Sequence, residues 1–373
     1  MTFKKSSRTL NEACCKSTNL LSFQNVAIDP SALTNGNDLT MPGGVNVSFS
    51  NLINPNGYFY TNNEGDEVLI TFNEENGHMF GSMKTSSGKS YAIEKCEGSH
   101  VWQEFDMQSF IDDEAIMSTS FSSPLTGLPD TQSFDLTSMS TYSVMIYYTP
   151  EFEAITSDIG GFIDQVLAET NQGYANSNVP VRIKKHCIER AGIDDMGSAK
   201  ELFRAFKPMK PTIDELVNTA DVAVLLFRKG GSGIGIFNSV VNYVPNISVM
   251  GKWYAENRFT FGHEIGHNFG LGYNREVEKH AHSIAYGHGH LIGNGFTTIM
   301  AYPGKNLTRT NYYSNPAVNF PYGPPTGIRG ISNNAAVLIS NRFIMAATGD
   351  ETSVCKGKPG NFFFFFMILI HIY

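Results

Sequence analysis

The amino-acid sequence predicts a small β-rich module followed by an α/β (α+β) domain with a mostly parallel sheet. Residues 57–106 consist of short alternating runs broken by Asn, Gly and Ser, which is typical of antiparallel strands. Residues 141–228 instead alternate dense apolar runs with helical repeats, a pattern that indicates strands and helices in turn. A chain of 373 residues is also long enough to bury two cores.

Composition divides the chain into four parts. Residues 1–56 are rich in Ser, Thr, Asn and Gly, and we expect poorly defined structure there. Residues 57–140 hold the β-rich module and a polar linker, and residues 141–346 hold the α/β domain. Residues 347–373 form a tail whose apolar end is too short to span a bilayer, and we expect this tail to lie outside the fold.

The α/β domain is predicted from segments that alternate in type. The strand-like segments are dense in β-branched and aromatic residues, as in buried parallel strands, whereas the first helix carries Ile159, Phe162 and Val166 on one face. A serine cap starts the second helix. In chain order we expect a strand at 141–150, a helix at 158–172, a strand at 179–188, a helix at 198–206, a strand at 220–228 and a glycine-rich edge strand at 229–241.

Charge and cysteine content exclude several classes of protein. A net charge of -8 argues against a nucleic-acid or anionic-membrane partner, because such proteins need clustered Lys and Arg. Neither a membrane span nor a phosphate-binding glycine loop is expected. The odd number of cysteines does not define a disulfide framework; they are Cys14, Cys15, Cys96, Cys187 and Cys355.

The segment GHEIGHNFGLGYN, residues 262–274, carries the clearest chemistry. On a helix, His263 and His267 lie one turn apart on the same face, so both imidazoles can bind one Zn²⁺ ion. The carboxylate of Glu264, beside the first histidine, is placed to act as a general base toward water. Gly270 permits a sharp turn with a positive φ, which would bring residue 273 back toward the metal.

These residues resemble the reprolysin-like branch of the metzincin zinc peptidases. The resemblance covers about 142–346 and rests on HEIGHNFGLG, on YGHGHLIGNGFTTIMAY and on YYSNPAVNF. It implies a metzincin-type catalytic domain that hydrolyses internal peptide bonds of a protein or peptide substrate, with Zn²⁺ as cofactor. Met300 would form an apolar floor beneath the histidines, and Tyr302 stands where some metzincins place a tyrosine near the metal. The β-rich module would then be prodomain-like.

The sequence departs from this family at Tyr273, where the third zinc-binding histidine is expected, and at the following Asn274, where Asp is common. Three interpretations remain open. A Tyr273 phenolate, or a substitute such as His280 or His282, completes the metal shell; two histidines and water hold zinc weakly; or zinc is lost. The first two give a zinc endopeptidase, and the third a catalytically dead, peptide-binding pseudoenzyme.

Two further features bear on regulation and location. Cys96 is the only thiol near the end of the prodomain-like module that could block the zinc, although a buried, idle cysteine is the simpler interpretation. No export signal is visible, but the family is secreted, and sequons at Asn46, Asn246 and Asn306 are weak evidence in the same direction. The histidines of segment 280–290 are more simply explained as solvated or supporting groups than as a second metal site.

Overall fold

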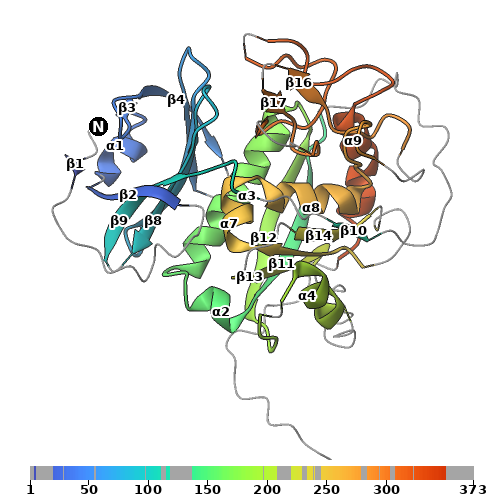
Figure 1. Ribbon diagram of the computed structural model, residues 1–373, viewed down its shortest axis with the longest axis horizontal. Helices are drawn as coiled ribbons and strands as arrows, with labels where there is room; N and C mark the ends of the chain where they lie inside the picture. Colours follow the sequence, from blue (N-terminus) through green and yellow to red (C-terminus); the bar gives the residue numbers. More distant parts are fainter. Residues whose placement is uncertain are drawn as a thin grey trace, which may run out of the picture.

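The computed structural model shows the N-terminal module packed beside the α/β domain (Figure 1). Helix α3 (Ile159–Asn176) runs between the blue strands of the module and the rest of the α/β domain. The residues that the structure describes are 4–5, 20–27, 29–53, 56–96, 98–110, 115–117, 137–195, 197–207, 220–228, 233–237, 239, 245–278, 284–293, 295–302, 307–321 and 323–349.

The module is built on one nine-stranded antiparallel sheet, in the order β1-β2-β9-β8-β7-β6-β5-β4-β3. Its own core, on one face, includes Val68, Ile70 and Trp102, and the short helix α1 (Pro30–Thr34) contributes Leu33. The strands are β1 (Lys4–Lys5), β2 (Leu20–Ala27), β3 (Leu39–Thr40), β4 (Asn46–Ile53), β5 (Gly57–Thr61), β6 (Glu67–Asn73), β7 (His78–Lys84), β8 (Ser90–Cys96) and β9 (Ser99–Phe105).

The prediction of poorly defined structure in residues 1–56 is wrong for residues 20–27 and 29–53. Strand β2 pairs with β9, and β4 pairs with β5, so this segment belongs to the same sheet as the predicted module. In β4, exposed and half-buried residues outnumber the two buried ones, Val47 and Ile53. The strand therefore lacks a strong apolar alternation, and its order comes from a partner strand that local sequence does not reveal.

The α/β domain contains a six-stranded sheet in the order β10-β14-β15-β13-β11-β12. Strands β15, β13, β11 and β12 pair in parallel, β14 runs antiparallel to β15, and β10 runs parallel to β14. The bounds are β10 (Ala115–Met117), β11 (Ser140–Tyr148), β12 (Val181–Arg190), β13 (Val222–Phe227), β14 (Gly233–Ile236) and β15 (Ile247–Gly251).

Strand β10 corrects the predicted organisation on two points. Residues 115–117 come from the segment expected to be a linker, yet they pair with β14 in the sheet of the α/β domain. Strand β14 was expected at the sheet edge, and in the described part of the chain β10 lies outside it. The SSPLTGLPDTQS stretch of the predicted linker falls outside the described residues.

Helices cover both faces of this sheet (Figure 1). One face packs against α3, α8 and α9, and the other against α4. A small three-stranded sheet follows α8 in the chain. The remaining bounds are α2 (Pro150–Glu153), α4 (Ala199–Phe206), α7 (Lys252–Asn257), α8 (Thr260–Phe269), α9 (Asn334–Met345), β16 (Leu291–Gly293), β17 (Phe296–Thr297) and β18 (Thr308–Arg309).

Polar caps start the predicted helices where the sequence places them. Ser198 caps α4 in a capping box with Glu201, whose side chain accepts from the Ser198 backbone N–H. Asp158 caps α3, because its Oδ1 accepts from the Gly161 N–H at 2.9 Å.

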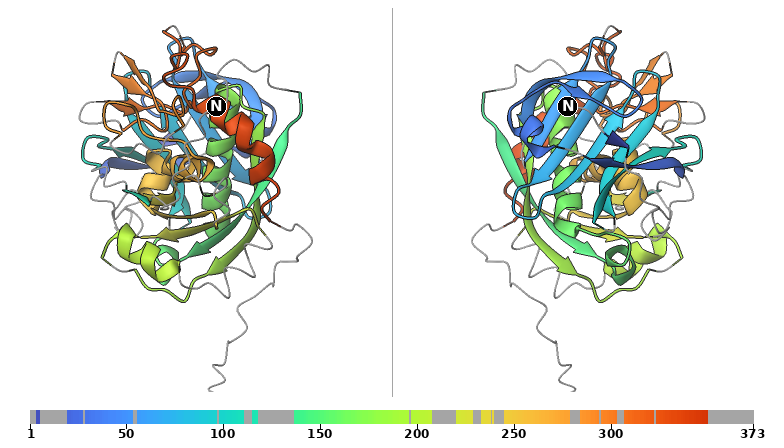
Figure 2. Two further views of the ribbon diagram at one scale, coloured as in Figure 1. Left: turned by 90° about the vertical axis from the view of Figure 1, so that its right-hand side faces the viewer. Right: turned by 90° about the vertical axis from the view of Figure 1, so that its left-hand side faces the viewer.

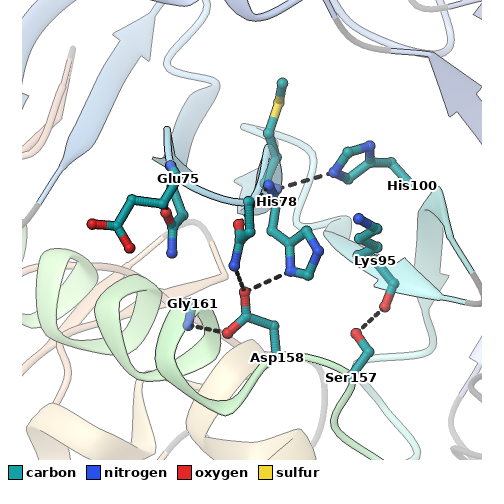
Figure 3. A network of polar contacts seen from close by, with 10 residues as sticks. Glu75, His78, Lys95, His100, Ser157, Asp158 and Gly161 are labelled. Carbon is teal, nitrogen blue, oxygen red and sulfur yellow. Dashed lines mark hydrogen bonds and ion pairs between the residues drawn. The ribbon is translucent and has the colours of Figure 1, made fainter.

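The module is attached to the α/β domain at the start of α3 (Figure 3). His78 Nδ1 lies 2.6 Å from Asp158 Oδ2, which also accepts from Asn76 Nδ2 at 3.0 Å. Ser157 Oγ donates to the Lys95 carbonyl oxygen. Strands β6 and β7 lie along α3, and the right-hand view of Figure 2 looks onto the module's strands with α3 behind them.

Three expectations about covalent features are changed by the structure. Cys96 and Cys187 are each in a disulfide bond, so Cys96 offers no free thiol to a metal and the cysteines are not idle. Asn246 is fully buried and its amide donates to the Asp221 carbonyl, so this sequon is inaccessible to glycosylation in the folded protein. Asn46 is exposed, whereas Asn306 is outside the described residues.

Two expectations concern membranes and the tail. Within the described residues, no helix is both long and apolar enough to cross a bilayer. The start of the predicted tail belongs to the fold, because the Gly349 N–H donates to Asp221 Oδ1 at 2.7 Å. Residues 350–373 lie outside the described residues.

Candidate active site

Helix α8, which carries the HEIGH segment, is buried along its whole length. Phe261, Ile265 and Phe269 pack into the core shared with α3 and α9. The helix ends at Gly270, which has φ 95° and lies in the left-handed region that the sequence predicts. The Leu271 N–H then donates to the Gly266 carbonyl at 3.0 Å, and this turn directs the chain back toward the histidines.

His263 and His267 project from the same face of α8, with ring centroids 4.6 Å apart. His263 Nδ1 lies 2.8 Å from the Ile299 carbonyl oxygen, and His267 Nδ1 lies 2.8 Å from the Leu271 carbonyl oxygen. A carbonyl oxygen only accepts, so each Nδ1 carries the proton. The lone pair of each neutral ring is therefore on Nε2, as a metal ligand requires.

Tyr273 lies beside both histidines, in the position expected for a third ligand. Its ring centroid is 5.7 Å from that of His263 and 5.0 Å from that of His267. The side chain is half-buried. The structure therefore brings Tyr273 to the pair, as predicted from the turn at Gly270.

The main chain at Tyr273 is held by groups that sequence reasoning did not identify. Its N–H donates to Glu278 Oε2 at 3.0 Å, and its carbonyl oxygen lies 2.9 Å from His288 Nδ1. Burial lowers the pKa of His288, which favours the neutral ring. The next residue, Asn274, accepts from the Tyr302 N–H at 2.8 Å. An amide oxygen can accept this hydrogen bond, so Asn at position 274 fulfils the acceptor role that an Asp would have there.

Glu264 is fully buried against strand β14. A Cβ atom at Gly233 would come within 2.6 Å of Glu264 Oε1, and one at Gly235 within 2.4 Å of the Glu264 carbonyl oxygen. Residues 233 and 235 face the same side of a strand, so two glycines at this spacing allow α8 to pack directly on β14. The glycines at alternate positions 233 and 235 were the feature of the sequence from which this close packing could have been predicted.

Met300 lies against the middle of α8. A Cβ atom at Gly266 would come within 2.5 Å of Met300 Sδ, and the methionine side chain is fully buried. Gly266 lies between His263 and His267 in the chain, so the sulfur packs against the turn of α8 that carries both histidines. The residue after Met300 is Ala301, and its carbonyl oxygen accepts a hydrogen bond from Arg309 Nη2 at 3.3 Å. Tyr302 lies next to Tyr273, with ring centroids 6.1 Å apart.

Two of the other histidines, His288 and His290, are described, and each contacts other groups. His280 and His282 fall outside the described residues. His288 contacts the main chain of Tyr273, and the backbone N–H of His290 donates to Thr298 Oγ1 at 2.9 Å. Among the described residues, no group of three or more His, Cys, Asp or Glu side chains could hold a metal ion.

Comparison with known families agrees with this geometry. The family described as metallo-peptidase family M12B, reprolysin-like, matches residues 139–328. The chain belongs to this family. The match runs from β11, through α8 and the Met300 turn, to the segment that follows β18.

Curated relatives of this reprolysin-like chain share one name, peptidyl-Asp metalloendopeptidase. The protein of Xanthomonas campestris pv. campestris is 26% identical over 274 residues, covering 70% of this chain and 65% of its own length. The Stenotrophomonas maltophilia K279a protein is 27% identical over 206 residues, covering 52% and 49%. The chain thus spans about half to just under two thirds of the length of these relatives. Among solved structures, metalloproteinase-II from Bacteroides fragilis aligns at 10% identity over 72% of this chain and 83% of that one, with a TM-score of 0.41.

The donor set of this reprolysin-like site fits zinc. Two neutral imidazoles with their Nε2 lone pairs on one side, and a phenol ring beside both, provide nitrogen and oxygen donors of the kind that zinc accepts. The backbone carbonyls that bind Nδ1 fix the tautomer and orientation of both rings. They belong to Ile299 and Leu271, which lie within the quoted motifs but had been given no role there.

Proposed function

We propose that this member of the reprolysin-like family is a zinc-dependent endopeptidase that hydrolyses internal peptide bonds of proteins. The observation that carries the proposal is the orientation of His263 and His267, whose Nδ1 atoms are both held by carbonyl oxygens. A merely structural histidine pair does not require both Nε2 atoms on one face, whereas a metal site does. Glu264, one residue after the first histidine, supports the same conclusion.

Each residue has a defined role in the proposed reaction. His263 and His267 hold the metal, and Met300, which packs against Gly266 on the same helix, is proposed to support them as an apolar floor. Zinc, when bound, acidifies water and polarises the scissile carbonyl. Glu264 takes the proton from the attacking water and delivers it to the leaving amine. Its burial against β14 keeps the carboxylate away from bulk solvent.

Tyr273 is proposed as the third protein ligand. Its ring lies beside both histidines, and its main chain is anchored by Glu278 and His288. Zinc favours the phenolate over the phenol, because a bound cation stabilises the anionic form of its ligand. This arrangement supports the first of the three interpretations of the Tyr273 departure, a complete shell with a modified third ligand.

The substrate is proposed to be a protein cleaved at peptidyl-Asp bonds. The support is the name that the curated relatives share, peptidyl-Asp metalloendopeptidase. The proposed location is extracellular, because disulfide bonds at Cys96 and Cys187 persist in oxidising compartments. The N-terminal module, with the sheet of strands β1–β9, is proposed to be prodomain-like, as the family resemblance implies.

The test is cleavage of a denatured protein by the full chain with added zinc. We expect cleavage that a chelator stops and that Glu264→Ala lowers by roughly 10²–10⁴-fold, the usual value of a general base. Glu153→Ala is the matched control, because this carboxylate is about half exposed and lies on α2. An unchanged rate in Glu264→Ala would remove Glu264 from the mechanism.

A Tyr273→His variant separates the enzyme from the alternative function. If both the natural chain and the variant cleave, Tyr273 is tolerated as a ligand and the protein is an enzyme. If only the variant cleaves, the natural chain is a disabled peptidase whose scaffold remains sound, as the pseudoenzyme alternative requires. The observation that favours the pseudoenzyme alternative is that a tyrosine ring, rather than a histidine ring, lies beside His267.

A further inference from the structure

The turn before α8, the helix that carries His263 and His267 and is called the metal helix below, is strained and short. Helix α7 ends at Asn257 and α8 begins at Thr260, so only Arg258 and Phe259 connect them. Phe259 has φ 54°, in the left-handed region that a bulky residue rarely adopts. Its carbonyl oxygen accepts from the His263 N–H at 3.0 Å. The conformation of this turn therefore determines where His263 lies.

The carbonyl groups of the turn are held by donors from distant parts of the chain. Lys84 Nζ, from the N-terminal module, donates to the Asn257 carbonyl at 2.7 Å. Arg309 Nη1 donates to the Arg258 carbonyl at 3.1 Å. The Lys84 ammonium group also lies 5.3 Å from the centre of the Phe259 ring, within the range of a cation–π contact. One module residue thus contacts both ends of the turn.

Charged groups of the α/β domain surround Lys84. Glu169 on α3 and Glu256 on α7 attract the ammonium group, while Arg258 repels it. Burial lowers the pKa of Lys84 to about 8, and the two carboxylates oppose this effect. Ser90 on β8 accepts a hydrogen bond from Lys84 Nζ. Lys84 therefore remains predominantly charged at neutral pH and can hold the Asn257 carbonyl at the end of α7.

Strand β7 is anchored to the α/β domain at both of its ends. His78, its first residue, contacts the cap of α3 at Asp158, as Figure 3 shows. Lys84, its last residue, contacts the Asn257 carbonyl. A strand attached at two points transmits a displacement of the module to the turn rather than absorbing it.

We propose that Lys84 is a positioning residue for the metal helix, and that it couples docking of the N-terminal module to the metal affinity of His263 and His267. The inference rests on the zinc site proposed above. The module then acts as a support that completes the metal site. Because such coupling is reciprocal, metal binding tightens the docking of the module by the same factor.

The first experiment measures the zinc dissociation constant of the full chain at neutral pH by competition with a chromophoric chelator. We expect Lys84→Met to raise this constant by at least about tenfold, as is usual when a group that orients a ligand is removed. Lys84→Arg, which keeps the charge, should recover most of the affinity. Lys89→Met is the matched control, because the Lys89 side chain is 59% exposed on the same hairpin and interacts with Glu104 and Tyr91, which both belong to the module. A Lys84→Met constant within about twofold of the natural chain, with an unchanged circular dichroism spectrum, overturns the proposal.

A second measurement needs no variant and decides the matter if Lys84→Met does not fold. Saturating zinc should slow amide hydrogen exchange in residues 78–90 of the module as well as in residues 259–267. Exchange in 78–90 that is the same with and without zinc overturns the coupling. If zinc binds, but Lys84→Met leaves the zinc dissociation constant unchanged and zinc leaves exchange in residues 78–90 unchanged, only this inference fails. If the natural chain binds no zinc at all, the proposed metal site fails, and the coupling with it.

Discussion

The buried carboxyl of Glu169 should make the stability of the folded protein depend on pH. Glu169 lies on α3 with a 4% exposed side chain, and its Oε1 accepts from the Ser82 hydroxyl at 2.8 Å. Burial raises its pKa from 4.5 to about 7, although Lys84 and Ser82 oppose the shift. The same kind of burial raises the pKa of the nearby Glu67 and Glu256 carboxyls to about 7.

The sign and size of the effect follow from proton linkage. Between pH 4.5 and about 7, folded Glu169 keeps a proton that the unfolded chain releases, so the free energy of unfolding falls as pH rises through this window. Each pKa unit corresponds to about 1.4 kcal/mol, so by pH 8 the ionised carboxylate costs about 3 kcal/mol. Below pH 4.5 both states are protonated and the cost vanishes.

Glu169→Gln removes the titration while keeping the shape and the acceptor for Ser82. We expect the variant to match the natural protein at pH 4.5 and to exceed it by about 3 kcal/mol at pH 8. The assay is urea unfolding followed by tryptophan fluorescence at both pH values. The control is Glu153→Gln, a 47% exposed carboxylate, which should change stability by no more than about 0.5 kcal/mol.

The opposite result would refute this reasoning. If Glu169→Gln is less stable than the natural protein at pH 8, then the carboxylate is ionised in the folded protein and its attraction to Lys84 outweighs its desolvation. The pKa of Glu169 would then lie below 4.5 in the folded protein, and stability would rise with pH instead.

Two further predictions concern packing and buried charge. Gly266→Ala places a Cβ atom 2.5 Å from Met300 Sδ, so it should destabilise the fold by about 1–3 kcal/mol in urea unfolding; unchanged stability would mean that the methionine moves freely. Lys252 and Glu94 form a buried ion pair of 2.8 Å between α7 and β8. Lys252→Met alone should cost about 3–5 kcal/mol, and adding Glu94→Leu should recover most of it. A loss that the second change does not recover would contradict the pairing.

Local sequence determines much of the α/β domain and the metal helix. Strands β11 and β13, and helices α3 and α4, fall where periodicity and caps predict them. The spacing of His263 and His267 determines their common face, because a helix repeats every 3.6 residues. Gly270 determines the turn, because its φ of 95° suits glycine. These features depend on residues a few positions apart, and so the sequence contains them.

Tertiary structure decided what depends on contacts between distant residues. Strands β2 and β4 exist because β9 and β5 pair with them, and no local pattern reveals such partners. The tautomers of His263 and His267 depend on the carbonyl oxygens of Ile299 and Leu271, and any amino acid at those positions offers a carbonyl. The contact of Lys84 with the turn before α8 joins residues 173 positions apart. Every residue has the same backbone carbonyl group, so the sequence does not mark which carbonyl will accept a hydrogen bond. Contacts between distant residues also leave no periodic pattern in the sequence, and so only the folded chain could show them.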